Sequence, residues 1–232
     1  VEQGAQLHRG NLDIGVVKGV ACIQWWQVIV NGFENHAGTT RMDDRQDALI
    51  SAAHFIIESN KIIKSVQGGV GTVGYIDAEP GAPNVIPGKV TMTLELRDEE
   101  DDILDDVFKR IKAKTKEIEQ LTSTTIEFKE LMHHIPAVHS DNRIVTHVWE
   151  AATELGYTSM LLASHASHDA QIMAQIAPMG MVFVPSIEGI SHAPGEYSNQ
   201  KDIANGANVL LHSIVKMDYE NFSLPEPKRV EL

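Results

Sequence analysis

Histidine is the residue type with the most chemical potential in this 232-residue sequence, which contains eleven of them. An imidazole binds metal ions and exchanges protons near neutral pH. Three histidines occur in polar loops with small neighbours: His36 in Asn-His-Ala-Gly-Thr-Thr, His165 in Ser-His-Ala-Ser-His-Asp and His192 in Gly-Ile-Ser-His-Ala-Pro. Small neighbours let a side chain and the backbone approach a ligand closely. These three histidines are therefore the first candidate site residues.

Each of these loops also has a simpler interpretation. The loop around His36 could be no more than a tight turn. The run from Ser164 to Asp169 contains serine, histidine and aspartate, but the members of a catalytic triad usually converge from separate segments. His165 and His168 could instead form a His-x-x-His metal pair. His192 follows an apolar run typical of a buried strand, and loops at the carboxyl ends of strands carry the sites of open α/β sheets. His192 is therefore a candidate metal ligand, although a lone histidine in such a loop need not bind a metal.

Arg97 is the candidate for binding an anion. It ends a strand-like run, and its planar guanidinium matches a carboxylate with two parallel hydrogen bonds. A salt bridge to Asp98 or one of its neighbours explains the same residue without a ligand. Both interpretations remain open on the sequence alone.

The periodicity of the first half predicts the elements that position His36 and Arg97. Strands with β-favouring composition alternate with helices whose apolar residues recur every three or four positions. The order is β-α-β-β-α-β, the ferredoxin-like pattern. The expected elements are a strand over 19–30, a helix through 48–56, strands over 70–76 and 89–96, a helix from about 98 to 116 and a strand over 124–131.

The second half predicts a different arrangement, in which helices alternate with two short apolar strands. This order is typical of a parallel sheet covered by helices. Two strands do not make such a sheet alone, so we expect the rest of it to lie outside this chain. The expected elements are helices over 143–155, 170–175 and 201–217 and strands over 159–163 and 180–185.

Composition excludes several classes of protein. There are 19 basic and 32 acidic residues, a net charge of −13, and this balance argues against a nucleic acid or an anionic membrane as partner. No apolar run reaches the roughly 18 residues that cross a membrane. The single cysteine, Cys22, cannot form an intramolecular disulfide, and the first residues do not resemble a signal peptide. We expect a cytoplasmic protein, and the charge balance does not identify its substrate.

Six short motifs occur in an order that resembles a known family. The chain resembles the ureido-hydrolysing branch of the M20 metallopeptidase-like family, which comprises N-carbamoyl-L-amino acid hydrolases, allantoate amidohydrolases and bacterial-type β-ureidopropionases. Each motif is weak alone, but together they extend the resemblance to about Met217. The motifs are Glu2-Gln3-Gly4, Asn35-His36-Ala37-Gly38-Thr39-Thr40, Asn84-Val85-Ile86-Pro87-Gly88, Leu96-Arg97-Asp98, His168-Asp169-Ala170-Gln171 and Gly189-Ile190-Ser191-His192.

The resemblance implies an α/β protein in which a ferredoxin-like lid and dimerisation domain is inserted into a zinc-peptidase-like α/β catalytic domain. The implied segments are part of the catalytic domain at 1–18, the lid at 19–135, the C-terminal segment of the catalytic domain at 136–222 and a tail at 223–232.

The resemblance also assigns roles to individual residues. His192 matches the last metal ligand of the family, and Arg97 matches the residue that binds the substrate carboxylate. His36 and Asn84 match lid residues that reach the site of the partner subunit and polarise the scissile carbonyl. The remaining matches are Gln3, a substrate-contacting glutamine, and Ala166 with His165, a backbone stretch that faces the substrate. The family usually has a small residue at position 165, so the shape of the substrate stays open.

The implied enzyme is a homodimer that uses two divalent metal ions, zinc or manganese, to hydrolyse linear ureido (N-carbamoyl) acids and release ammonia. In the family, the general base and the other metal ligands precede the segment that matches Val1. We therefore expect this chain to be inactive by itself. Two alternatives remain: an M20 aminoacylase or dipeptidase, and a non-catalytic ferredoxin-like module for dimerisation or ligand binding.

Overall fold

The chain changes sheet twice, at Ala21 and at Pro136, and so forms two units. The computed structural model describes residues 2–220, without the side chains of Gln3, Ala5 and His133. We call Cys22–Pro136 the inserted unit, and Val1–Ala21 together with Ala137–Leu232 the split unit. The predicted tail at 223–232 lies outside the described residues.

The inserted unit is an antiparallel four-stranded sheet with two helices. The strand order β5-β7-β3-β8 is that of a ferredoxin-like fold, which confirms the pattern predicted from the sequence. Its elements are β3 (Cys22–Asn31), α2 (Ala48–Lys64), β5 (Val70–Glu79), β7 (Lys89–Asp98), α3 (Asp101–Thr122) and β8 (Thr125–Ile135).

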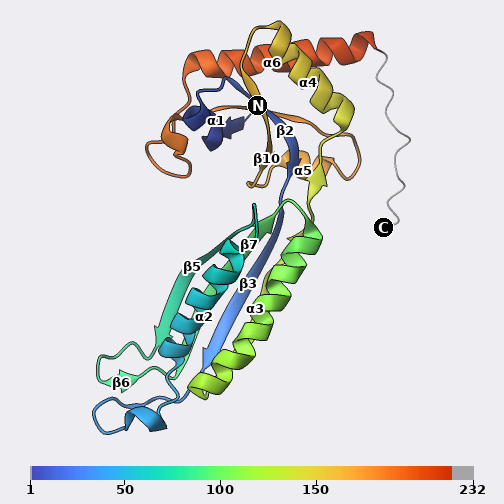
Figure 1. Cartoon of the computed structure of the whole chain (residues 1–232). Helices are drawn as coiled ribbons and strands as arrows, with labels where there is room; N and C mark the ends of the chain where they lie inside the picture. The colour runs from blue at the N-terminus through green and yellow to red at the C-terminus, as the bar shows by residue number, and fades with distance from the viewer. Residues whose placement is uncertain (1, 221–232) are drawn as a thin grey trace. The chain divides into compact units, whose positions relative to one another are not determined.

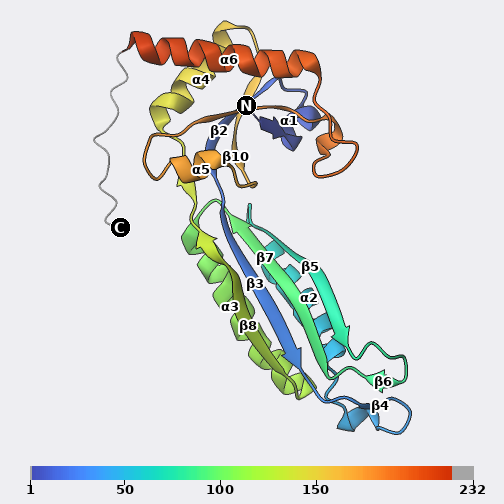
Figure 2. The same ribbon diagram turned by 180° about the vertical axis from the view of Figure 1, so that it is seen from behind.

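One face of this sheet is covered by both helices, and the other face is not. Figure 1 shows α2 and α3 in front of the strands, and Figure 2 shows the strands from behind, uncovered by helices. The sequence of β7 explains the difference, because buried Val90, Met92, Leu94 and Leu96 alternate with more exposed residues. Arg97 lies among the latter, so it belongs to the open face.

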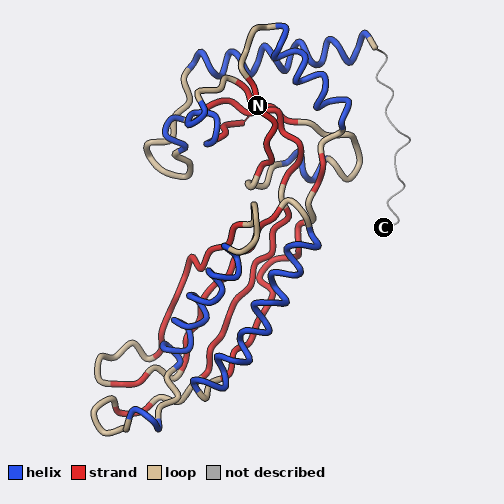
Figure 3. The backbone as a smooth tube through the Cα atoms, in the orientation of Figure 1, coloured by secondary structure: helices blue, strands red, loops and turns tan. Residues whose placement is uncertain are grey.

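Two short strands that the sequence did not predict lie at one end of the inserted unit. Strand β4 (Asn35–His36) pairs antiparallel with β6 (Val85–Ile86), and Figure 3 shows this pair among loops. A single 3-10 turn, η1 (Met42–Asp44), follows β4. We predicted loops here because two-residue strands carry no periodicity. Helix α2 then begins after Asp47, whose Oδ1 accepts hydrogen bonds from Leu49 N at 2.9 Å and Ile50 N at 3.2 Å.

The single strand predicted over 19–30 is wrong. The run contains the end of β2 (Ile14–Val20) and most of β3, and these strands belong to different sheets. Ala21 lies between them and donates its N–H to the carbonyl of Ser164 at 2.8 Å. An uninterrupted apolar composition does not reveal where a chain leaves one sheet for another.

The split unit contains a mixed sheet, and the predicted all-parallel sheet is wrong. Its order is β1-β11-β2-β10, with β9 also paired to β2. Strand β10 is parallel to β2, whereas β11 is antiparallel to β2. The strands are β1 (Glu2–Gly4), β2, β9 (Val138–His139), β10 (Ser159–Ser164) and β11 (Met181–Pro185).

The short helix between β10 and β11 explains this reversal. Helix α5 (Asp169–Met173) has five residues, a length of about 7 Å. A parallel crossover has to return along the whole strand, which is about 20 Å for six residues. The chain therefore enters β11 from the end of the sheet at which it left β10. Strands β1, β2 and β9, which we had not assigned to this sheet from the sequence, also pair within it.

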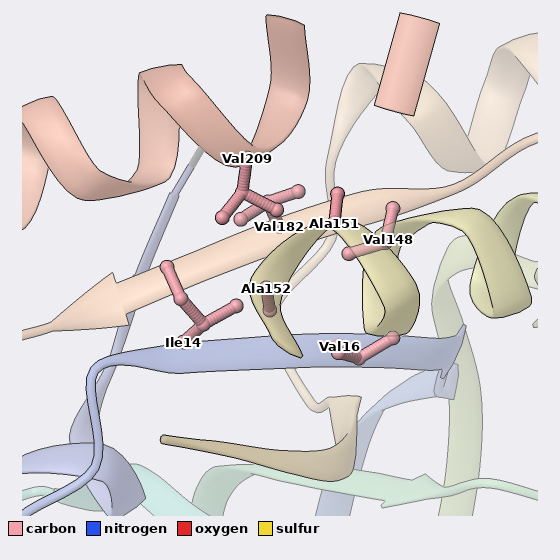
Figure 4. Close-up of a cluster of buried hydrophobic side chains, with 7 residues drawn as sticks. All are labelled: Ile14, Val16, Val148, Ala151, Ala152, Val182 and Val209. Atoms are coloured by element: carbon pink, nitrogen blue, oxygen red, sulfur yellow. The ribbon is translucent and has the colours of Figure 1, made fainter. Parts of the chain in front are cut away.

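Helices cover both faces of this mixed sheet. Helices α4 (Asn142–Glu154) and α6 (Gln200–Tyr219) bury one face, and Figure 4 shows the side chains that fill the space between them and β2 and β11. Helix α1 (Ala5–Gly10) covers the other face through Leu7, which packs with Val17, Leu162 and Phe183. Within residues 2–220 there is no helix both long and apolar enough to span a membrane.

Candidate active site

A pocket of about 470 Å³ lies in the split unit and brings together three predicted residues. The loop from Ser164 to His168 forms one wall, and His192 lies on another. His165, Ala166 and His192 therefore share one cavity, as we expected of site residues. The rest of the lining is Glu2, Gly4, Gln6, Leu162, Ala163, Phe183, Ser191 and Glu196. The backbone of Gln3 pairs with Val184 next to this pocket lining, but its side chain lies outside the described residues.

His192 reaches the pocket by a route that differs from our prediction. Because β11 is antiparallel to β10, the carboxyl ends of these two strands lie at opposite ends of the sheet. The segment after β11 makes the turn η2 (Ile187–Gly189), where Glu188 donates its N–H to Nδ1 of His8 at 3.2 Å. The loop then returns to the cavity.

The backbone of His192 has a conformation that non-glycine residues rarely adopt. Its φ is 55°, and its N–H donates to Oε2 of Glu196 at 2.8 Å. Left-handed residues of this kind cluster at functional sites, where the surrounding contacts maintain them. The sequence did not point to Glu196 as the residue that holds this turn.

His168 faces the same cavity in a largely uncharged state. Burial lowers the pKa of the His168 imidazole, while the carboxylates of Glu2 and Asp169 oppose the shift. Its Nε2 lies 2.8 Å from Oγ of Ser164, and its ring meets Phe183 edge-on at 5.8 Å between centroids. Ser164 is 2% exposed and donates its hydroxyl to a backbone carbonyl, so the geometry does not support a serine nucleophile.

His36 lies in the inserted unit, exposed on the β4–β6 pair. Its Nδ1 accepts a hydrogen bond from the N–H of Gly38 at 3.0 Å. An imidazole that accepts at Nδ1 carries its proton at Nε2 when it is neutral. The turn thus presents His36 as a neutral Nε2–H donor, the form that stabilises developing negative charge on an oxygen.

Arg45 holds the turn that carries His36. The guanidinium Nη2 donates to the carbonyls of Ala37 at 2.6 Å and Thr40 at 3.1 Å. Ala37 also donates its N–H to the carbonyl of Asn84 at 2.9 Å, so the predicted residues His36, in β4, and Asn84, directly before β6, lie close together. The loop is therefore a tight turn that also exposes the Nε2–H of His36 as a donor. The sequence did not reveal the role of Arg45 in holding this turn.

Arg97 forms a salt bridge with a residue that the sequence did not single out. Its Nε and Nη2 donate to the two carboxylate oxygens of Glu95 at 2.8 and 2.9 Å. Both side chains lie half-buried on the open face of the sheet, because residues two apart on a strand point the same way. We had expected a salt bridge to Asp98 or one of its neighbours. Asp98 itself is buried on the helix face, and the carboxylate of Glu95 is bound instead.

The described residues do not fit a pair of divalent metal ions by themselves. Across residues 2–220, no group of three or more histidine, cysteine, aspartate or glutamate side chains has a geometry that could hold a metal ion. Catalytic zinc sites use at least three protein ligands. His192 is therefore at most one member of a ligand set, and His165 with His168 does not form a complete site.

The role of Arg45 yields a test of the His36 turn. Replacing Arg45 with alanine removes three charge-assisted hydrogen bonds to the carbonyls of Ala37 and Thr40, so backbone amides of residues 35–40 should exchange with deuterium about tenfold faster. Arg41→Ala is the matched control, because exposed Arg41 contacts Asp43 at 4.0 Å. Equal exchange in the two variants would contradict the role of Arg45.

Comparison with known proteins shows which family this chain resembles. The model of peptidase family M20/M25/M40 matches residues 1–216. An N-carbamoyl-L-amino acid amidohydrolase of Geobacillus stearothermophilus is 36% identical over 92% of this chain and 52% of its own length. A ureidoglycolate hydrolase of Arabidopsis thaliana is 35% identical over 95% of this chain and 47% of its own length.

A solved structure agrees with these relatives. The structure of an amidase of the hydantoinase/carbamoylase family from Burkholderia multivorans has a TM-score of 0.87 and 34% identity, and it covers 93% of this chain and 53% of its own. The chain thus spans about half the length of the relatives it matches. The resemblance inferred from the six sequence motifs is confirmed, and the chain belongs to peptidase family M20/M25/M40.

Proposed function

We propose that this chain is part of an amidohydrolase that cleaves linear ureido acids, such as N-carbamoyl-L-amino acids or allantoate, and releases ammonia. The observation that carries the proposal is the identity of 35–36% over more than nine-tenths of the chain to relatives that are ureido hydrolases by name. An aminoacylase or dipeptidase is the alternative within the family, and a non-catalytic module is the alternative outside catalysis.

The inserted unit would supply the groups that bind and polarise the substrate. We assign His36 to the ureido carbonyl, since a neutral Nε2–H donor suits an oxygen that gains negative charge. Arg97 would bind the substrate carboxylate, and Glu95 would hold its guanidinium in place beforehand. Asn84 would contact the substrate beside His36.

The split unit would supply the pocket and one metal ligand. We assign His192 to a centre of two divalent ions, zinc or manganese, and Gln3, His165 and Ala166 to contacts with the substrate. The other ligands and the general base would come from polypeptide outside these 232 residues. This assignment is supported by the coverage of the relatives, because the chain spans only about half of their length.

The outer face of α6 also supports the proposal that polypeptide outside these 232 residues completes the split unit. Apolar residues that recur three or four positions apart are 40–58% exposed on the side opposite buried Val209. An amphipathic helix buries one stripe, so a second apolar stripe indicates additional polypeptide packed against it. The exposed residues are Ile203, Leu210, Leu211, Ile214 and Val215.

The activity itself is tested by ammonia release. The intact polypeptide with Mn²⁺ or Zn²⁺ should release ammonia from N-carbamoyl-L-amino acids or allantoate, whereas residues 1–232 alone should not. Hydrolysis of N-acyl amino acids or dipeptides without ureido cleavage would identify the alternative enzyme. The absence of any hydrolysis by the intact protein would favour the non-catalytic module.

The role of Arg97 predicts a particular change in kinetics. Lysine keeps the charge but loses the planar fork, so Arg97→Lys in the intact enzyme should raise KM for carboxylate substrates about tenfold or more. Lys89→Arg is a control, because Lys89 pairs with Glu79 at 2.7 Å at the far end of β7. An unchanged KM in Arg97→Lys would exclude this residue from substrate binding.

We also propose that the protein is a homodimer formed through the inserted unit. Strands β5 and β8 are the edges of its sheet, and an exposed edge can be satisfied by pairing across a two-fold axis. In such a dimer, His36 and Asn84 would act in the site of the partner subunit.

Sedimentation of the intact protein tests the dimer. The expected result is a species with twice the mass of the polypeptide at micromolar concentration. A monomer at every concentration, with full activity, would contradict the action of His36 and Asn84 across subunits.

A further inference from the structure

The last residue of β10 and the loop that leads to α5 form a continuous wall of the pocket. These five residues, Ser164 to His168, all line the cavity. Three of them are serine or alanine, which do not fix a loop by packing. Ordering an unrestrained backbone costs conformational entropy at every residue. The conformation of this wall therefore depends on specific hydrogen bonds.

The hydroxyl of Ser164 provides these bonds. Its Oγ donates to the carbonyl of Ala166 at 2.9 Å and accepts the N–H of Ala166 at 3.2 Å. A third contact, at 2.8 Å, joins the same oxygen to Nε2 of His168. A serine hydroxyl has one proton and two lone pairs, so three partners saturate it.

This saturation decides which atom donates in the contact between Ser164 and His168. A carbonyl oxygen only accepts, so the single hydroxyl proton belongs to the bond with Ala166. His168 is then the donor at Nε2, and its neutral form is the Nε2–H tautomer. Burial, which lowers the pKa of His168, is consistent with that neutral form.

Contacts elsewhere anchor both ends of the loop. The carbonyl of Ser164 accepts the N–H of Ala21 at 2.8 Å, and Nε2 of Gln171 donates to the carbonyl of Ala21 at 3.0 Å. The ring of His168 is held from its other side by Phe183. The loop is thus fixed at Ser164 on one side and near Gln171 on the other. The hydrogen bond between His168 and Ser164 joins the two ends of the loop.

We propose that His168 is a positioning residue whose Nε2–H, acting through the Ser164 hydroxyl, fixes the backbone of Ala166 at the wall where substrate binds. This inference rests on the proposed function, because the substrate is the ureido acid assigned above. It gives a function to a histidine that is neither the proposed metal ligand, His192, nor the proposed polarising donor, His36.

Glutamine at position 168 separates this role from others, because its amide offers an N–H donor at about the reach of Nε2 and does not titrate. In the intact protein, His168→Ala and Ser164→Ala should each lower kcat/KM for a ureido acid by about 100-fold, the effect of misplacing a substrate by about 1 Å. His168→Gln should retain activity within about threefold. The double variant should be no worse than either single alanine variant, since both break one bond.

Hydrogen exchange of residues 164–168 provides a readout that does not depend on activity. His168→Ala and Ser164→Ala should speed exchange of this loop, and His168→Gln should not. Ser213→Ala and His212→Gln are matched controls, because Ser213 bonds Val209 within α6 at 2.7 Å and His212 is exposed. Ser164→Ala retains the ring packed against Phe183, so it remains informative if His168→Ala does not fold.

The outcomes distinguish this inference from the proposed function. If the wild type cleaves no ureido acid, the proposed function fails, and exchange still reports on the loop. Fast exchange in His168→Gln, or a protected loop in Ser164→Ala, overturns the hydrogen-bond role. A loosened loop with unchanged kcat/KM overturns the positioning role.

Discussion

The pairing of strand β2 is the constraint on which the split unit depends. This strand comes from the start of the chain and pairs with β9, β10 and β11, which all follow the inserted unit. The pocket exists only because β2 joins these segments. Close packing enforces the register, since a Cβ at Gly15 would come within 2.9 Å of both Leu162 and Phe183.

Polar groups in the candidate site are held mainly by backbone atoms of their own loops. His36 accepts a bond from its own turn, Arg45 donates to carbonyls of that turn, and Ser164 bonds both polar atoms of Ala166. Such local bonds form wherever the short motif folds, whatever the remainder of the chain does. The geometry of these loops therefore follows largely from their own short sequences.

The sequence predicted the inserted unit well because its strands are long and alternate regularly. Strand β7 is the clearest case, and the order of elements follows from such patterns. The split unit was harder to predict, since its sheet is assembled from distant segments and the antiparallel entry of β11 depends on the length of α5. Among the candidate site residues, His36, His165 and His192 were proposed from composition and loop context. Arg45, Glu95 and Glu196 were missed, because a residue that orients another shows no signal of its own before the fold is known.

We propose that His36 and Arg97 are the groups of the inserted unit that bind a ureido acid. A crystal structure of the intact protein with a non-hydrolysable ureido acid would test this assignment. We expect the carbonyl oxygen of the ligand to lie within hydrogen-bond distance of His36 Nε2 and its carboxylate to pair with Arg97. An ordered ligand that contacts neither residue would show that the assignment is wrong.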